Sequence, residues 1–226
     1  MSLARVVIPT NSSGPSADVA ELIRIAELRT ASLMKRRRWA TTGFVPSNAS
    51  ILFHTLRGLS DGELANGNSF CEWGSGSGTV TCVAAKLGWD AHGIEIEPEL
   101  VDESNRLASH FSLAATFVQG NFVPSKRRQI AQQAFDDNLG RYPWLNNQAE
   151  DAYQKLGRSI ASFDVVFAYP WPGEMPYIEQ LFIAEAADGA LLVTYDDTSS
   201  VNVWRRVTSR PSATTEAHAS PIVPIG

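Results

Sequence analysis

An acidic residue followed by three closely spaced glycines is the first feature of this chain whose residue types suggest chemistry. The segment FCEWGSGSG places Glu72 two residues before the first of Gly74, Gly76 and Gly78. Glycine tolerates positive φ and lets another molecule approach the backbone closely, at a cost in conformational entropy. This spacing therefore indicates that a ligand lies against the loop.

A second acid indicates the kind of ligand. Glu95 ends the next apolar segment, AHGIEI, 21 residues after Gly74. A carboxylate at that place can accept hydrogen bonds from both hydroxyls of a ribose. A dinucleotide loop has the spacing GxGxxG and faces a pyrophosphate, whereas this loop reads GxGxG. Glu72 is poorly suited to a pyrophosphate and well suited to an amino-acid amino group, so we expect a ribose-containing ligand, with adenosine favoured.

The elements that must position these acids alternate between strand and helix. Apolar runs predict strands near residues 69–73, 91–96, 115–118, 163–168 and 189–195, and helices near 78–88, 98–111 and 174–187. This alternation predicts an α/β fold with a doubly wound, mostly parallel sheet. The glycine loop then lies at the carboxyl end of the first of these strands, where open α/β sheets bind ligands.

A helical extension, residues 1–66, is predicted before a ligand-binding domain of residues 67–226. Its first helix is expected to start with a capping box of Asp18 and Glu21, and its second helix with Ser47 as cap. The run Lys35–Arg38 is interpreted as the solvated end of the first helix, with a local nucleic-acid patch as the alternative.

Two segments depart from simple strand and helix alternation. An insertion at about residues 124–161 predicts two helices around the loop GRYPWLNN, either as a lid over the site or as a packing pair without ligand contact. Near the end of the chain VNVWRRV predicts a further strand, and IVPI either pairs at a sheet edge or stays mobile.

Composition excludes several classes of protein. The 226 residues are 44% hydrophobic and 19% charged with a net charge of −5, which is ordinary for a soluble globular protein. The two cysteines, Cys71 and Cys82, allow no disulfide framework, and the four scattered histidines offer no metal-ligand spacing. We therefore expect no metal. Because neither a signal peptide nor a membrane span is visible, we expect a cytoplasmic protein that makes no membrane contact.

The combined motif resembles that of the class I S-adenosylmethionine-dependent methyltransferases, which have a Rossmann-like fold. The matching segments are CEWGSGSGTV and HGIEIEPELV, and the resemblance extends over about residues 69–197. It implies S-adenosylmethionine as cofactor. It also implies that Glu72 and the three glycines shape the methionine end of the site and that Glu95 binds the ribose. The neighbouring Ser75 and Ile96 complete this part of the predicted cofactor-binding set.

The stretch QGNF falls where members of this family commonly read adenine. The resemblance implies that Asn121 hydrogen-bonds the exocyclic amine and that Phe122 covers the ring. The alternative is an asparagine turn followed by a core aromatic residue.

The loop YPWPGE follows the fourth predicted strand, at the family's catalytic position. Family members that methylate amino groups often carry an NPPY-type sequence there, and this chain lacks its asparagine. We expect Tyr169 and Trp171 to form the substrate wall, or else a turn packed under the insertion. If a general base is needed, Tyr169, Glu174, His54 and Asp196 are the candidates.

The resemblance implies an enzyme that transfers a methyl group, with a small-molecule acceptor favoured. The aromatic residues of YPWP and RYPWL suit such an acceptor, while the basic runs Lys35–Arg38 and Lys126–Arg128 leave RNA or protein acceptors open. Two other classes remain as alternatives: a binding protein for S-adenosylmethionine or S-adenosylhomocysteine without catalysis, and an NAD-dependent oxidoreductase. The glycine spacing and Glu72 disfavour the second of these.

Overall fold

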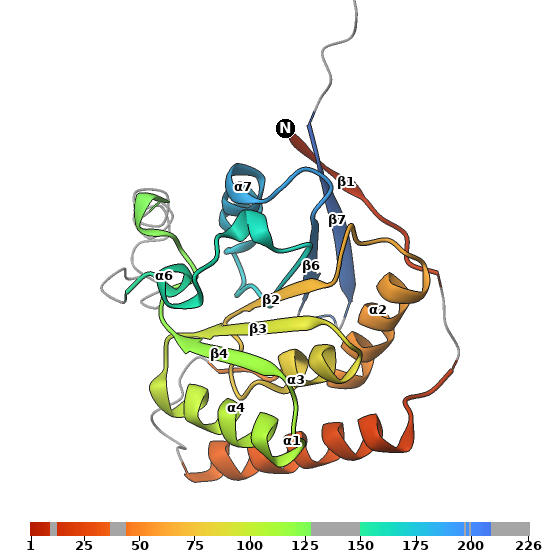
Figure 1. Ribbon diagram of the computed structural model, residues 1–226, viewed down its shortest axis with the longest axis vertical. Helices are drawn as coiled ribbons and strands as arrows, with labels where there is room; N and C mark the ends of the chain where they lie inside the picture. Colours follow the sequence, from red (N-terminus) through yellow and green to blue (C-terminus); the bar gives the residue numbers. More distant parts are fainter. Residues whose placement is uncertain (10–12, 37–43, 128–149, 197, 199, 209–226) are drawn as a thin grey trace, which may run out of the picture.

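A computed structural model describes residues 1–9, 13–36, 44–127, 150–196, 198 and 200–208 of the chain (Figure 1). In this part of the chain seven strands form one sheet in the order β1-β7-β6-β5-β2-β3-β4. The strands are β1 Ser2–Arg5, β2 Ser69–Trp73, β3 Asp90–Glu95, β4 Ala115–Gln119, β5 Val165–Ala168, β6 Leu191–Tyr195 and β7 Val201–Val207. Neighbours from β4 to β6 pair in parallel, and only the β6–β7 and β7–β1 pairs are antiparallel. The predicted α/β fold with a mostly parallel sheet is confirmed.

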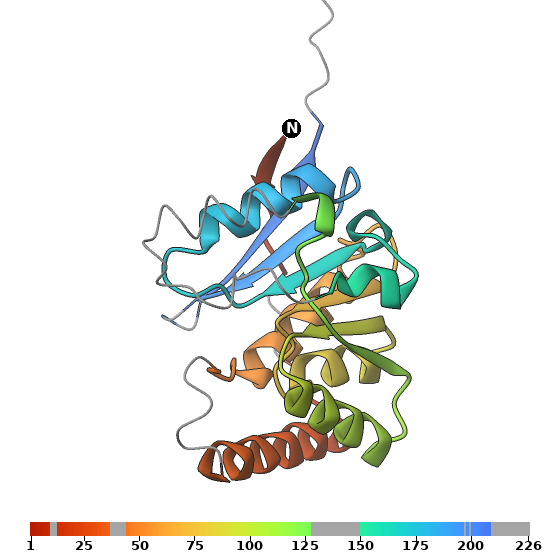
Figure 2. The same ribbon diagram turned by 90° about the vertical axis from the view of Figure 1, so that its left-hand side faces the viewer.

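Helices cover both faces of this sheet (Figure 2). The described helices are α1 Ala17–Arg36, α2 Ala49–Asp61, α3 Thr79–Lys86, α4 Pro98–His110, α6 Ala152–Leu156 and α7 Met175–Glu185, with short 3-10 turns η1 Ser125–Arg127 and η3 Ile160–Ser162. One face packs against α2, α3 and α4, with α1 outside them, and the other face packs against α6, η3 and α7. Successive residues of β2 therefore point into two separate cores.

The helix starts differ slightly from the predicted ones. The cap of α2 is Asn48, whose side-chain oxygen accepts bonds of 3.1 and 3.2 Å from the amides two and three residues later. The predicted cap, Ser47, is therefore wrong by one residue. Helix α1 begins at Ala17, so Asp18 lies inside the first turn rather than at the cap. There its charge still complements the helix dipole.

The first residues of the extension form a strand that the sequence pattern did not indicate. β1 pairs antiparallel with β7, with Ser2 opposite Val207 and Arg5 opposite Trp204. Because β7 is itself antiparallel to β6, β1 runs in the direction of the central strands. The predicted strand VNVWRRV is confirmed as β7. The segment IVPI lies outside the described residues.

The structure describes the first and last residues of the predicted insertion, and the Asp151 side chain connects these two segments by hydrogen bonds. Asp151 caps α6 by accepting a 3.0 Å bond from the Tyr153 amide, and its second oxygen accepts a 2.9 Å bond from the Ser125 amide. The loop GRYPWLNN lies outside the described residues, as do Arg37 and Arg38. The preceding Lys35 and Arg36 are exposed in the last turn of α1, as expected of a solvated helix end.

Neither a membrane helix nor a metal cluster is found where the chain is described. None of the described helices has the length and apolar character needed to cross a membrane. The same residues contain no group of three or more His, Cys, Asp or Glu side chains that would hold a metal ion. Cys71 and Cys82 are buried free thiols.

Candidate active site

The three glycines of the loop after β2 all adopt positive φ. Gly74, Gly76 and Gly78 have φ of 75°, 54° and 79°, in the left-handed region that strains other residues. The amides of Gly74 and Ser75 both donate 2.9 Å hydrogen bonds to the Ile94 carbonyl, which holds the loop against β3. The backbone itself therefore requires glycine here.

The surroundings of the three glycines differ. A Cβ atom added to Gly74 would meet no heavy atom within 4 Å, so this side of the loop is open. At Gly76 it would collide with the ring of Phe44, and at Gly78 with Ser104. Gly74 therefore leaves room for a ligand, whereas Gly76 and Gly78 leave room for the protein itself.

Ser75 contributes a buried hydroxyl to the same loop. The residue is 5% exposed, and its Oγ has no hydrogen-bond partner among the described residues. A buried hydroxyl without a partner costs free energy, which a polar ligand atom would recover.

Glu95, the last residue of β3, is hydrogen-bonded to the glycine loop. One of its oxygens accepts 2.7 and 3.0 Å bonds from the Ile96 and Glu97 amides, and the other accepts a 2.8 Å bond from the Gly76 amide. Burial raises the pKa of the Glu95 carboxyl, and the three amides act in the opposite direction. A carboxylate has about four acceptor positions, so one remains for a ligand hydroxyl, on the oxygen that Gly76 contacts. Acceptance from a second hydroxyl would require one of the amide bonds to be given up.

Glu72 points from β2 toward α3. One carboxyl oxygen accepts a 2.9 Å bond from the Thr81 amide and a 2.5 Å bond from the Thr81 hydroxyl. Burial raises the pKa of the Glu72 carboxyl to about 8, although the bonds from Thr81 lower it. The predicted partner of the cofactor's amino group is thus already tied to the first turn of α3.

Asn121 and Phe122 lie where the chain leaves β4. The Asn121 side-chain oxygen accepts a 2.8 Å bond from the Val123 amide, which is the asparagine-turn geometry. Phe122 stacks on Trp73 with ring centroids 5.2 Å apart and an interplanar angle of 9°. Both contacts belong to the alternative considered from the sequence, and contact with adenine stays a prediction.

The YPWPGE loop lies beside the glycine loop. Ala168, at the end of β5, pairs with Trp73, at the end of β2, so the two loops leave adjacent strands at one edge of the sheet. Tyr169 is half-buried and meets Tyr195 edge-on with ring centroids 4.9 Å apart. Trp171 is also half-buried. The structure brings this loop and the glycine loop together, as the topology required.

Two residues of this site were not found from the sequence. Phe44 precedes α2 and places its ring against Gly76, although it lies 32 residues earlier in the chain. Thr81 fixes Glu72 from one turn into α3. A lone aromatic residue in a turn carries no periodic signal. A threonine one helical turn after a glycine loop, by contrast, is a signal that was available.

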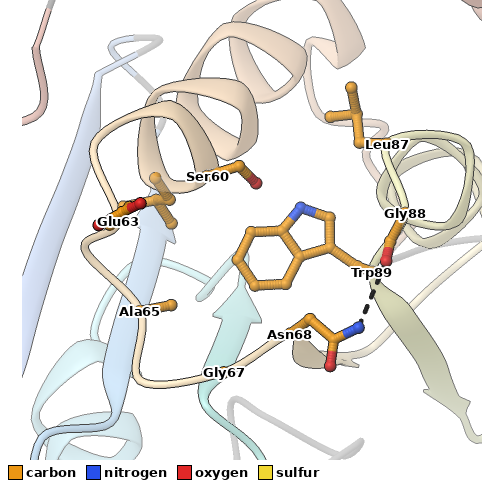
Figure 3. A pocket seen from close by; sticks show the side chains of 9 residues that line it. Ser60, Glu63, Ala65, Gly67, Asn68, Leu87, Gly88 and Trp89 are labelled. Atoms are coloured by element: carbon orange, nitrogen blue, oxygen red, sulfur yellow. Dashed lines mark hydrogen bonds between the residues drawn. The ribbon is translucent and has the colours of Figure 1, made fainter.

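The opposite edge of the sheet holds a separate pocket of about 260 Å³ (Figure 3). Trp89 lies at its centre, flanked by Ser60 at the end of α2 and by Leu87 after α3. Asn68, which precedes β2, also lines it. Since the glycine loop follows the carboxyl end of β2, this pocket is not part of the candidate site.

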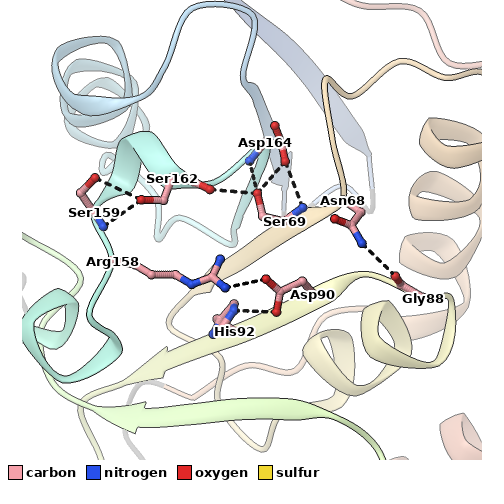
Figure 4. Close-up of polar contacts among 9 residues, drawn as sticks. All are labelled: Asn68, Ser69, Gly88, Asp90, His92, Arg158, Ser159, Ser162 and Asp164. Atoms are coloured by element: carbon pink, nitrogen blue, oxygen red, sulfur yellow. Dashed lines mark hydrogen bonds and ion pairs between the residues drawn. The ribbon is translucent and has the colours of Figure 1, made fainter.

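A polar network occupies the same opposite edge (Figure 4). Asp90 forms an ion pair with Arg158, with 2.7 Å between the guanidinium nitrogen and one carboxylate oxygen. The other carboxylate oxygen lies 3.0 Å from Nε2 of His92. Nearby, the Ser69 hydroxyl and amide donate 2.6 and 3.0 Å bonds to Asp164. This network ties β2 and β3 to the segment before β5 and gives His92 a structural role.

Comparison with known proteins was made by sequence and by structure. No protein-family model and no curated protein matches the sequence. A methyltransferase from Geobacter sulfurreducens matches the structure with a TM-score of 0.50 at 13% identity, over 85% of this chain and 92% of that one. The chain therefore has the fold of this methyltransferase.

Two further methyltransferase structures match this chain with lower TM-scores. An RNA methyltransferase from Salinibacter ruber, in complex with S-adenosylhomocysteine, has a TM-score of 0.49 at 18% identity, over 74% of this chain and 97% of that one. A methyltransferase from Thiobacillus denitrificans, also with S-adenosylhomocysteine, has a TM-score of 0.40 at 16% identity, over 69% of this chain and 51% of that one.

Proposed function

We propose that this protein binds S-adenosylmethionine between the glycine loop and Glu95 and transfers its methyl group to a small-molecule acceptor. One observation carries the proposal. Three glycines at positive φ follow β2, and the carboxylate that ends β3 bonds to the middle one. This joins the two parts of the sequence motif into one site.

The residues present fit such a cofactor. Gly74 has an open side, Ser75 has a buried hydroxyl without a partner among the described residues, and Glu95 retains an acceptor position. These groups would hold the methionine end and the ribose. S-adenosylmethionine supplies a methyl group that its sulfonium already makes electrophilic. The chain's own task is then to align the acceptor and exclude water, which supplies several kcal/mol in general, ~7–11 in favourable cases.

The roles of the remaining residues follow from their places in the fold. The YPWPGE loop leaves β5 next to the glycine loop, so Tyr169 and Trp171 would form the acceptor wall. Asn121 and Phe122, after β4, would border the adenine. Half-buried aromatic side chains are typical of sites for small, partly apolar ligands, which supports a small-molecule acceptor.

Methyl transfer is tested with S-adenosylmethionine carrying a labelled methyl group. The purified protein is incubated with a panel of small amines, phenols, thiols and carboxylic acids, and labelled product and S-adenosylhomocysteine are both quantified. We expect labelled product from at least one class and its loss in Glu95→Ala. Asp102→Ala, an exposed change on α4, is the matched control.

The outcomes separate the alternatives. Binding of S-adenosylhomocysteine without transfer to any acceptor would favour a non-catalytic binding protein. Transfer to RNA or protein fractions only would contradict the small-molecule acceptor.

A further inference from the structure

A buried pair of hydroxyls joins the helical extension to the glycine loop. The Thr30 hydroxyl, in the second half of α1, lies 2.7 Å from the Ser77 hydroxyl, which follows Gly76 in that loop. Both residues are 5% exposed. Thr30 lies 47 residues before Ser77, so only the packing of α1 brings the two hydroxyls together. The bond therefore crosses the boundary that the sequence predicts between the extension and the ligand-binding domain.

The Thr30 hydroxyl is not explained by the packing of its own helix. Five of the six buried residues of α1 are apolar, and Thr30 is the exception. A buried hydroxyl costs free energy unless it is hydrogen-bonded. A threonine inside a helix commonly bonds to the carbonyl four residues earlier, as Thr55 of α2 does with Ile51 over 3.0 Å. Thr30 bonds instead to another segment, although valine would pack equally well in an apolar face.

Ser77 lies between two glycines of the loop. Gly76 and Gly78 both adopt positive φ. Because glycine has no Cβ and adopts left-handed and right-handed conformations about equally readily, a segment with alternate glycines has a variable backbone of its own. A hydrogen bond to the Ser77 side chain therefore restrains a segment that its own residues would leave free.

The same segment makes the contacts on which the proposed cofactor site depends. The Gly76 amide donates a 2.8 Å bond to Glu95, the proposed ribose acceptor. The Gly76 carbonyl accepts a 3.0 Å bond from the hydroxyl of Ser104, a fully buried residue of α4. These two bonds fix the peptide groups on either side of Gly76, and Thr30 fixes the next side chain. The loop is thus held from β3, α4 and α1 together.

Helix α1 is itself held in a defined place. Its buried apolar side chains share one core with those of α3 and α4 (Figure 1). Arg29, the residue before Thr30, forms a 3.2 Å ion pair with Glu103, which is 6% exposed and precedes Ser104. Adjacent residues therefore join α1 to α4 and both helices to the glycine loop, so a shift of α1 would reach Gly76 through a single residue.

We propose that Thr30 is a positioning residue for the cofactor site: its bond to Ser77 holds the glycine loop in the geometry that binds S-adenosylmethionine, which makes α1 part of the site. This inference rests on the proposed function. Thr30 acts through Ser77 rather than by contact with the cofactor. Because coupling between two equilibria is reciprocal, a ligand that requires this loop geometry also strengthens the hold of the loop on α1.

Four substitutions separate positioning from packing. Thr30→Val removes the hydroxyl and keeps a branched side chain, and Thr30→Ser keeps the hydroxyl. Ser77→Ala removes the partner. Thr55→Val is the matched control, because Thr55 is 7% exposed and its hydroxyl bonds within α2 rather than to the loop.

Calorimetric titration with S-adenosylhomocysteine measures the affinity of each variant, and urea unfolding measures its stability. We expect Thr30→Val and Ser77→Ala each to weaken binding about five- to tenfold, which corresponds to one hydrogen bond. The double variant should lose no more than either single variant, because both changes break the same bond. Thr30→Ser should bind as the unmodified protein does, and Thr55→Val should keep full affinity even where it loses stability.

Hydrogen exchange gives a second readout that a threonine of purely structural importance would not change. Saturating S-adenosylhomocysteine should slow amide exchange in α1 around Thr30 in the unmodified protein. The slowing should be much smaller in Thr30→Val, because the bond between the loop and the helix is missing.

Four results would overturn the inference: Thr30→Val binds S-adenosylhomocysteine as tightly as the unmodified protein, Thr30→Ser does not recover the affinity, Thr55→Val loses as much affinity as Thr30→Val, or the ligand leaves amide exchange in α1 unchanged. Lower stability of Thr30→Val with full affinity belongs to the first of these and would make Thr30 a packing residue. If the unmodified protein binds no S-adenosylhomocysteine, the proposed function fails and this inference fails with it, which is a distinct result.

Discussion

Burial strongly raises the pKa of the Glu72 carboxyl. The pKa of its carboxyl is raised to about 8, chiefly because burial disfavours the charged form. A group whose pKa is higher in the folded state stabilises the protein fully below its unfolded pKa, here about 4.5. That contribution is lost as the pH rises from about 4.5 to about 8, the folded value.

Glu72→Gln should therefore remove a pH dependence. We expect the free energy of unfolding of the variant, relative to the unmodified protein, to rise by on the order of a few kcal/mol between pH ~5 and pH ~8. Urea unfolding at both pH values measures it, with exposed Glu63→Gln as the control. A difference that stays constant across this pH range would show that Glu72 does not titrate abnormally.

The glycines permit a sharper test of the loop. Alanine at either Gly74 or Gly76 must adopt positive φ, which costs about 1–2 kcal/mol. Only Gly76→Ala also displaces the ring of Phe44, so it should destabilise the protein more than Gly74→Ala. Adding Phe44→Ala should recover part of that difference in a double-mutant cycle.

Ligand binding should reverse this order. Gly74→Ala should lower the affinity for S-adenosylhomocysteine more than Gly76→Ala does, although it destabilises the protein less, because its new methyl group enters the open side of the loop. Calorimetric titration of both variants measures the two affinities. Equal unfolding free energies for the two single variants, with no effect of Phe44→Ala, would refute the assigned contacts.

Site residues that belong to a local sequence motif could be predicted from the sequence. Site residues that reach the site only through contacts with distant segments could not. The glycines and Glu95 stand at fixed offsets from predicted strands, so their place in the fold followed from the sequence. Phe44 reaches Gly76 only because α2 packs on α3, which no local pattern encodes. The cap of α2 was missed by one residue because serine and asparagine are almost equally good caps.

At the scale of whole elements, the parallel strands were predictable because each is a short apolar run between turns. β1 was not, because its four residues, SLAR, have no strand-like alternation and only Leu3 is half-buried. Its partner, β7, begins 199 residues after β1 begins. Such pairing is decided by tertiary structure rather than by local preference.

This strand should matter for stability and not for the site. Leu3 packs against the core on the α6 and α7 face, whereas Ala4 is exposed. We expect Leu3→Ser to lower the unfolding free energy by about 1–2 kcal/mol and Ala4→Ser to change it little. Neither should alter the affinity for S-adenosylhomocysteine, measured by calorimetry. A loss of affinity in folded Leu3→Ser would mean that β1 supports the site.

At the scale of the whole molecule, two sets of polar groups lie at opposite edges of the sheet. The carboxyl ends of β2, β3 and β5 carry the glycine loop, Glu95 and the YPWPGE loop, which are the groups with a proposed chemical role. The amino ends carry the Asp90 and Asp164 networks, which hold strands together. This separation follows from the parallel topology, because all strand ends of one kind meet at one edge.

The most direct test of the account is calorimetric titration of the protein with S-adenosylmethionine, S-adenosylhomocysteine and NAD, repeated on Glu95→Ala and on Asp102→Ala. We predict that the first two ligands bind and that NAD does not. Glu95→Ala should weaken binding about ten- to hundredfold while Asp102→Ala leaves it unchanged. Binding of NAD alone, or of no ligand, would contradict the assignment of the glycine loop and with it the proposed function.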